Sequence, residues 1–179
     1  MTDIVKFIDV SHWRKYVPWA SFLKHGWVAA YIKGDAKAEE NFRDARAVGY
    51  RRLGVYLWHD PIMSVEWNVS QAIKYYNLVN PKFIVMDIEH YWKKWSQWNA
   101  AVRGTMPWSE VEAFSGSFIS NHAKRFTEEV ARRVDVPVLI YSGAWFVNSR
   151  APQLATWFKD YPYINADYSS VPNKYIKCT

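Results

Sequence analysis

The sequence PKFIVMDIE occupies residues 81–89 and joins an apolar run to two acidic residues. The apolar residues 83–86 are typical of a strand that is buried on both faces, as the strands of parallel sheets are. Side chains alternate across a strand, so Asp87 and Glu89 point to one side, with their Cα atoms roughly 6 to 7 Å apart. Because buried carboxylates must be paired or neutralised, the pattern indicates either a catalytic pair or an acidic strand end that caps a helix or pairs with Lys or Arg.

Strand and helix patterns alternate on both sides of this stretch. We expect strands over residues 4–11, 27–33, 53–59, 83–89, 136–142 and 163–168. We expect helices between residues 18 and 26, over 38–48, 65–79 and 108–134, and around Trp145 and Trp157. This order predicts parallel strands joined by right-handed crossovers, which is an α/β fold of the TIM-like (β/α) barrel class, in a single domain over residues 1–179.

Two further features lie where such a barrel builds its active site. Asp9 is a third acid near a strand end, on the same strand face as Phe7 and Ser11. Residues 90–107 show no clean periodicity and predict a long loop after Glu89, at the C-terminal end of a parallel strand. Its tryptophans recur every three residues, which fits both a helical turn packed on the barrel and a platform for a flat ligand: Trp92, Trp95 and Trp98.

Composition narrows the class of partner. The 23 Lys and Arg exceed the 17 Asp and Glu and give a net charge of +6, which favours an anionic partner such as nucleic acid, a membrane surface or a polyanionic cell wall. The basic residues are scattered and not interleaved with aromatics, so we expect no nucleic-acid binding. Cys178 is the only cysteine, which excludes an intramolecular disulfide. Aromatic residues make up 18% of the chain, more than a small core needs, so some are candidates for lining a groove for flat ligands such as sugar rings.

The sequence also bears on location. No apolar run approaches the roughly 18 to 20 residues of a membrane span, so we expect no membrane insertion. The N-terminal MTDIVK lacks a basic region followed by an apolar stretch, so we expect no secretory signal.

Five short motifs stand in order between residues 4 and 168. They are FIDVSHW at 7–13, YIK at 31–33, NFRDARAVG at 41–49 leading into GVY at 54–56, MDIE at 86–89, and IY at 140–141. Their order and spacing resemble those of the glycoside hydrolase family 25 lysozymes, the Chalaropsis-type muramidases of bacteria and phages. This resemblance implies hydrolysis of the β-1,4 bond between N-acetylmuramic acid and N-acetylglucosamine in the glycan strands of peptidoglycan, without a cofactor or metal ion.

The resemblance also implies roles for the acids. Glu89 matches the general acid, and Asp87 and Asp9 match the carboxylates that line the catalytic cleft. Two negative charges and partial desolvation raise the pKa of Glu89, so we expect Glu89 to stay protonated while Asp87 or Asp9 stays ionised. Inward-facing or strand-end residues and the loop after Glu89 supply the candidate sugar contacts: Lys33, Tyr56, Trp58, Trp92, Tyr141 and Asp167. Lys33 is also placed to pair with one of the acids.

The chain departs from the family pattern at its C-terminal end. Family members continue for two further strands, the last with another cleft acid, and tend to have Trp at the position of Ile164. We therefore expect an incomplete barrel that is shortened or completed by a partner chain. Exposed sheet edges would then favour self-association or covering by the tail. Without a signal peptide, the expected setting is the host cytoplasm and then, after phage-type release, the cell wall.

Two other functions fit the same residues. One is a metal-dependent barrel hydrolase, with ligands at the same rim from Asp9, His12, His59, Asp87 and His90, although the chain lacks an HxH or HExxH spacing. The other is a catalytically silent barrel that binds peptidoglycan through its aromatic rim.

Overall fold

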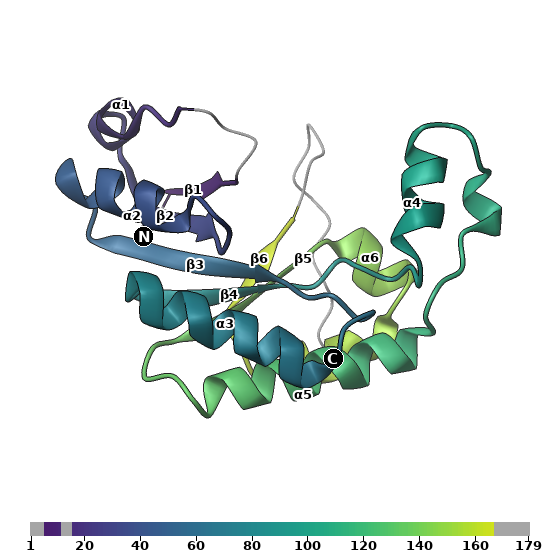
Figure 1. Ribbon diagram of the computed structural model, residues 1–179. Coiled ribbons are helices and arrows are strands. Elements are labelled where there is room, and N and C mark those ends of the chain that lie inside the picture. The colour runs from purple at the N-terminus through teal and green to yellow at the C-terminus, as the bar shows by residue number, and fades with distance from the viewer. Residues whose placement is uncertain (1–5, 12–15, 167–179) are drawn as a thin grey trace.

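The computed structural model describes residues 6–11 and 16–166 of the 179-residue chain. Its centre is one sheet of six parallel strands, each paired with the next along the chain, which curls into a half-barrel with helices against its outer face (Figure 1). The strands are β1 (Lys6–Val10), β2 (Trp27–Lys33), β3 (Arg52–Trp58), β4 (Phe83–Asp87), β5 (Val138–Ser142) and β6 (Tyr163–Asn165). The predicted α/β fold with an incomplete TIM-like barrel is confirmed.

The helices follow the strands in alternation, as crossover connections between parallel strands require. They are α1 (Trp19–Lys24), α2 (Ala38–Ala47), α3 (Val65–Val79), α4 (Trp95–Val102), α5 (Gly116–Ala131), α6 (Ala144–Ser149) and α7 (Ala155–Phe158), with short 3₁₀ turns η1 (Trp108–Glu110) and η2 (Pro152–Leu154). None of the helices in the described ranges combines the length and apolar character that a bilayer crossing requires.

The ends of α3 show why its bounds could be predicted. The Ser64 hydroxyl accepts a hydrogen bond from the Trp67 N–H at 3.1 Å, which satisfies a free donor of the first turn. At the other end Asn80 adopts the left-handed conformation with φ 45°, and Pro81 prevents the helix from continuing.

The helix predicted over residues 108–134 is wrong in its first part. Residues 108–110 form only η1, and the N–H of Phe114 donates to the carbonyl of Tyr91 at 2.7 Å instead of to a helical carbonyl. The Ser115 hydroxyl then caps a helix that begins at Gly116. The predicted loop over residues 90–107 contains α4, so residues 92–114 form an arm that stands away from the half-barrel (Figure 1).

The two faces of the sheet carry different packing. The outer face holds the larger core, whose fully buried side chains from α2, α5 and the strands include Phe42, Phe126, Ile84 and Met86. The inner face holds a smaller cluster of Tyr31, Tyr56, Val85, Tyr141 and Ala166. Strand alternation therefore divides each strand between a helix-covered side and a concave side.

Both edges of the described sheet are open. Within residues 6–11 and 16–166, β1 and β6 each pair with a neighbour on one side only. The self-association expected from open edges stays a prediction.

Close packing on the inner face generates a stability prediction. A Cβ added at Gly54 would lie 2.1 Å from the Phe83 ring, which is also packed edge-on against Phe7 at 5.9 Å between centroids. We expect Gly54→Ala to lower the free energy of unfolding by about 1–3 kcal/mol, because overpacking displaces the ring. Urea unfolding measures the change. Phe83→Leu replaces the ring with a smaller side chain, so the double variant should lose less free energy of unfolding than the sum of the losses of the two single variants. Strictly additive losses would contradict this packing.

Candidate active site

The three predicted acids come together on the inner face of the half-barrel. Asp9 lies on β1, Asp87 ends β4, and Glu89 follows it on the same side, as the alternation of the strand predicted. The negative charge of Asp9 raises the pKa of both Asp87 and Glu89, as a neighbouring carboxylate does. The fold thus concentrates three potential negative charges at the C-terminal ends of its strands.

Asp87 is the most deeply buried of the three acids, with 7% of its surface exposed. Burial, the nearby Glu89 and the nearby Asp9 together raise the pKa of Asp87 well above its ordinary value, while Lys33 acts in the opposite direction. Of the two acids of which one or the other was expected to stay ionised, Asp87 is the one whose desolvation favours the protonated carboxyl. The alternation of side chains along a strand could not show that Asp87 is buried more deeply than Asp9 and Glu89.

Asp9 is more exposed and lies beside a cation. Desolvation raises the pKa of Asp9 to about 6, and the charge of Lys33 and a hydrogen bond from Tyr56 limit the increase. Lys33 lies on β2 directly opposite Tyr56 in the strand register, which brings both groups to the same level of the sheet. Asp9 is therefore an acid that ionises near neutral pH, and Lys33 is placed beside an acid as predicted.

Glu89 is half-buried at the start of the loop that leads into the arm. Burial and the negative charge of Asp9 raise its pKa, whereas a hydrogen bond from the backbone N–H of Gly143 lowers it. Gly143 immediately precedes α6, so this donor belongs to a helix N-terminus. The prediction of a raised pKa at Glu89 is confirmed, and the Gly143 donor is a contact that the sequence analysis missed.

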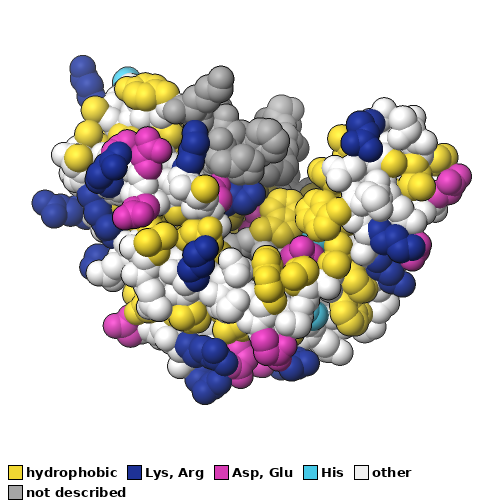
Figure 2. Space-filling view, in the orientation of Figure 1, with side chains coloured by type: hydrophobic (Ala, Val, Ile, Leu, Met, Phe, Trp, Pro, Cys, Tyr) yellow, Lys and Arg dark blue, Asp and Glu magenta, His cyan; other side chains and the backbone are white. Residues whose placement is uncertain are grey.

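Several polar atoms of this site have no hydrogen-bond partner within the described residues. They are one carboxylate oxygen each of Asp87 and Glu89 and the indole nitrogen of Trp58, which pairs with Asp87 in the strand register. Buried polar atoms are nearly always satisfied, so unsatisfied ones at a concave surface are available for a ligand. In Figure 2 the same side is hollowed between the arm and the rest of the molecule, with hydrophobic and acidic side chains on the floor.

The inner-face tyrosines lie beside the acids, because Tyr31 is opposite Asp9 and Tyr141 is opposite Asp87 in the strand register. The Tyr31 ring meets the Tyr56 ring edge-on at 5.9 Å and the Tyr141 ring at 6.2 Å, and all three are less than a tenth exposed. Trp58 is less buried, and the ammonium of Lys33 lies 5.7 Å from its ring centroid. Of the predicted sugar contacts, Lys33, Tyr56, Trp58 and Tyr141 therefore share one surface with the acids.

Trp92, a further predicted sugar contact, lies away from the acids. Trp92 is 7% exposed and sits inside an aromatic cluster at the base of the arm, where its ring stacks on Trp98 at 5.1 Å and meets Trp95 edge-on at 5.7 Å. Trp95 is 40% exposed, so this residue, rather than Trp92, presents a ring face to solvent. Asp167 lies outside the described residues.

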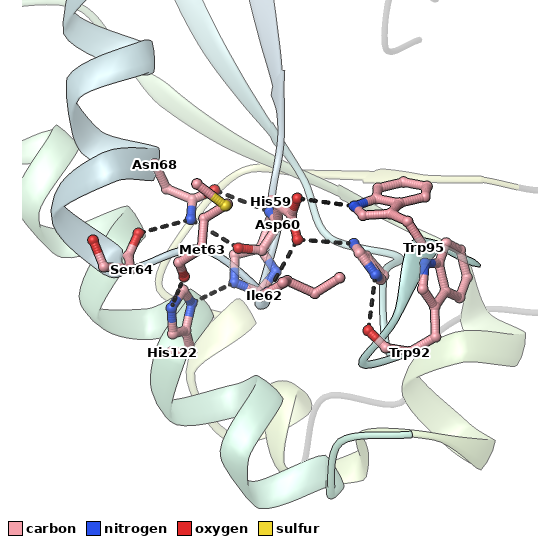
Figure 3. A network of polar contacts seen from close by, with 10 residues as sticks. His59, Asp60, Ile62, Met63, Ser64, Asn68, Trp92, Trp95 and His122 are labelled. Carbon is pink, nitrogen blue, oxygen red and sulfur yellow. Dashed lines mark hydrogen bonds and ion pairs between the residues drawn. The ribbon is translucent and has the colours of Figure 1, made fainter. Parts of the chain in front are cut away.

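A polar network ties the segment after Glu89 to the end of β3 (Figure 3). The buried His90 ring contacts the carbonyl of Trp92 at 3.0 Å through Nε2 and the carboxylate of Asp60 at 3.4 Å through Nδ1. The Trp95 indole also donates to Asp60 at 3.4 Å. Asp60 thus anchors both the residue that follows Glu89 and the first turn of the arm, a role that sequence spacing gave no reason to expect.

The histidines in the described part of the chain do not form a metal site with the acids. His59 is fully buried on the helix-covered side, where its Nε2 lies 2.8 Å from Nδ1 of His122 on α5 (Figure 3). Burial lowers the pKa of His59 well below its ordinary value, and the neighbouring His122 and His90 add to the effect. His12 lies outside the described residues, and the described residues contain no group of three His, Cys, Asp or Glu side chains arranged to hold a metal ion.

An acid cluster at the C-terminal ends of barrel strands, with a cation and aromatic rings beside it, defines a glycosidase type of site. The family model for glycosyl hydrolases family 25 matches residues 8–178, and the chain belongs to this family. No curated protein sequence matched the chain.

Solved structures support the fold. The muramidase from Acremonium alcalophilum superposes with a TM-score of 0.74 at 16% identity, covering 98% of this chain and 83% of that one. A family GH25 lysozyme from Aspergillus fumigatus gives 0.73 at 20% identity, covering 96% and 81%. The bacterial lysozyme from Streptomyces coelicolor gives 0.69 at 23% identity, covering 98% and 79%. At these identities the likeness establishes a shared fold.

The position of Lys33 generates a prediction about titration. Removing its charge in Lys33→Met withdraws a stabilising influence on the ionised form of Asp9, so the pKa of Asp9 should rise from about 6 toward roughly 7. Carboxyl ¹³C NMR across a pH series measures the midpoint. Lys82→Met removes an exposed lysine just before β4, at the opposite end of the sheet, and should leave the midpoint unchanged. Equal midpoints in Lys33→Met and wild type would contradict the pairing.

Proposed function

We propose that this family 25 glycosyl hydrolase is a muramidase that cleaves the β-1,4 bond between N-acetylmuramic acid and N-acetylglucosamine. The observation that carries the proposal is the set of three coupled carboxyls on one concave face, two of which keep an unpartnered oxygen in the described part of the chain. Glycoside hydrolysis needs one carboxyl that is protonated near neutral pH and another that is ionised. Burial raises the pKa of both Asp9 and Glu89, and the charge of Lys33 favours the ionised form of Asp9.

Glu89 acts as the general acid in this proposal. Its raised pKa keeps a proton available for the glycosidic oxygen, which takes that proton as its bond to C1 breaks. Water then supplies hydroxide to C1, and the remaining proton returns to the carboxylate cluster. The Gly143 N–H stabilises the carboxylate that Glu89 becomes after it has donated its proton.

The two aspartates act on the sugar ring. Asp9 ionises at about pH 6 and places negative charge near the reaction centre, where positive charge develops at C1 in the transition state. Asp87 lies deeper, and its free oxygen is placed to orient the acetamido group of the substrate. Lys33 limits the rise in the pKa of both acids and so sets the pH above which the charge is present.

The proposal predicts the products and the effect of one substitution. Wild type should release fragments with muramic acid at the reducing end from purified peptidoglycan, detected by mass spectrometry after borohydride reduction. Glu89→Gln keeps the size of the side chain but removes the proton donor, so the rate should fall roughly 10²- to 10⁴-fold. Glu39→Gln on the exposed face of α2 should retain the wild-type rate.

A different result would identify the alternative function. If wild type binds peptidoglycan but releases no new reducing ends, and Glu89→Gln binds equally well, the chain is a glycan-binding barrel and not an enzyme.

We also propose a bacteriolytic setting of the endolysin type, in which the protein reaches the wall after release from a phage-infected cell. The net charge of +6 supports this proposal, because it favours approach to anionic wall polymers. Activity on whole walls should therefore fall as ionic strength rises above about 0.15 M. In a producing culture the protein should enter the medium together with a cytosolic marker enzyme; its appearance well before the marker would contradict release by lysis.

A further inference from the structure

A second pocket lies at the base of the arm, outside the acid cluster. It has a volume of about 470 Å³ and is lined by Tyr91, Trp108, Ser109, Val111, Ala113 and Arg150. We call it the arm pocket. Its residues come from both legs of the arm and from the end of α6, so it forms only when these segments pack together.

The walls of the arm pocket are fixed by backbone hydrogen bonds. Trp92 and Ala113 form an antiparallel bridge, the Lys93 N–H donates to the carbonyl of Glu112 at 2.7 Å, and the Phe114 N–H donates to the carbonyl of Tyr91 at 2.7 Å. These bonds hold the outgoing and returning legs of the arm as a short ladder. The pocket is therefore formed before a ligand arrives, which lowers the entropy lost on binding.

Arg150 gives the pocket its charge. The guanidinium lies 4.6 Å from the centroid of the Tyr91 ring, and no carboxylate of the described residues lies within ion-pair distance of it. Its backbone is held closely against α5, because a Cβ added at Gly116 would lie 2.6 Å from the Arg150 carbonyl oxygen. The pocket thus presents a positioned cation that the described part of the chain leaves without a counterion.

The other lining groups fit an anion attached to a less polar chain. Trp108 is 55% exposed and supplies a flat apolar surface, Tyr91 supplies a second ring, and Ser109 supplies a hydroxyl. Glu110 lies in the same turn but does not line the pocket. A guanidinium stacked on an aromatic ring is suited to a carboxylate, which it binds with two parallel hydrogen bonds.

Short stretches of chain connect the arm pocket to the proposed general acid. Tyr91 follows Glu89 by two residues, and Gly143, which donates to Glu89, starts the helix that ends before Arg150. That helix, α6, has six residues and so spans about 9 Å. An extended peptide covers roughly 3.3–3.6 Å per residue, so two or three peptide residues bridge this distance.

We propose that the arm pocket binds a carboxylate of the stem peptide, the short acidic peptide that the lactyl group of N-acetylmuramic acid carries in peptidoglycan. This inference rests on the proposed muramidase function, because it requires the muramic acid unit to lie next to Glu89. Arg150 pairs with the carboxylate, and Trp108 covers the adjoining peptide. The pocket makes the enzyme prefer peptide-bearing glycan to bare glycan.

Two substrates that differ only in the peptide test the proposal. Initial rates of reducing-end release are measured on purified peptidoglycan and on the same glycan after an amidase has removed its stem peptides. We expect Arg150→Gln and Trp108→Ala to lose about tenfold in kcat/KM on the intact substrate. On the stripped glycan both variants should stay within about twofold of wild type, because the pocket is then empty in all three proteins.

A matched control separates a specific effect from loss of positive charge. Arg51→Gln removes an exposed arginine near the opposite end of the sheet and should match wild type on both substrates. Thermal unfolding of each variant shows that the arm remains folded. Equal losses on the two substrates, or no loss on either, would overturn the proposal.

A direct binding measurement keeps this test independent of the muramidase proposal. If wild type cleaves neither substrate, the proposed function fails, and the arm pocket is then tested with a soluble N-acetylmuramyl peptide that carries free carboxylates. Tryptophan fluorescence should change on titration of wild type, and Arg150→Gln should abolish the change. Absence of binding to wild type would refute the stem-peptide site.

Discussion

Three carboxyls share one concave surface, and the rest of the structure accommodates the unfavourable energy of placing them there. Ionisation is unfavourable when like charges lie close together in a partly desolvated site, and the pKa values of all three acids are therefore raised. The fold tolerates the arrangement because each acid ends or follows a strand of a sheet whose outer face is extensively packed. Lys33, Tyr56 and the Gly143 N–H then offset part of the repulsion.

The helix-covered side supplies the rigidity that positions the acids. Main-chain pairing fixes Asp87 between Trp58 and Tyr141, and the Trp95 indole ties the segment after Glu89 to Asp60, just beyond β3. His59 and His122 pair with each other on this side, and desolvation lowers the pKa of both imidazoles. Desolvation thus favours the uncharged form on both faces. It raises the pKa of the acids on the inner face and lowers the pKa of the imidazoles on the helix-covered side.

The sequence predicted those parts of the site that depend on local periodicity. Alternation along residues 83–89 placed Asp87 and Glu89 on one face. The proximity of Lys33 and Trp58 to the acids was expected from the family resemblance. The apolar repeat likewise predicted a helix over residues 65–79, which are the observed bounds of α3.

The features that the sequence did not predict depend on long-range contacts. The arm is held by a bridge between Trp92 and Ala113 and by the bond from Trp95 to Asp60, and neither pairing leaves a periodic signal. The apolar residues Val111 and Phe114 continue the helical spacing of α5, so the predicted helix began too early. In the structure the Ser115 side chain caps the first turn, and the helix begins at Gly116. The depth of Asp87 relative to Asp9 depends on the curl of the sheet, which periodicity does not encode.

The raised pKa values also link the site to stability. A carboxyl with a raised pKa binds its proton more tightly in the folded chain than in the unfolded chain, so its contribution to stability is present at acid pH and is lost as the pH rises. For Asp9 this contribution is complete below the ordinary pKa of 3.8 and is lost as the pH rises through about 6. The negative charge of Asp9, which a glycosidase needs near C1, therefore forms in the same pH range in which the fold loses the stability that protonated Asp9 contributes. Lys33 affects both activity and stability, because it lowers the pKa of Asp9. The negative charge of Asp9 is then present at lower pH, and less folding stability is lost when that charge forms.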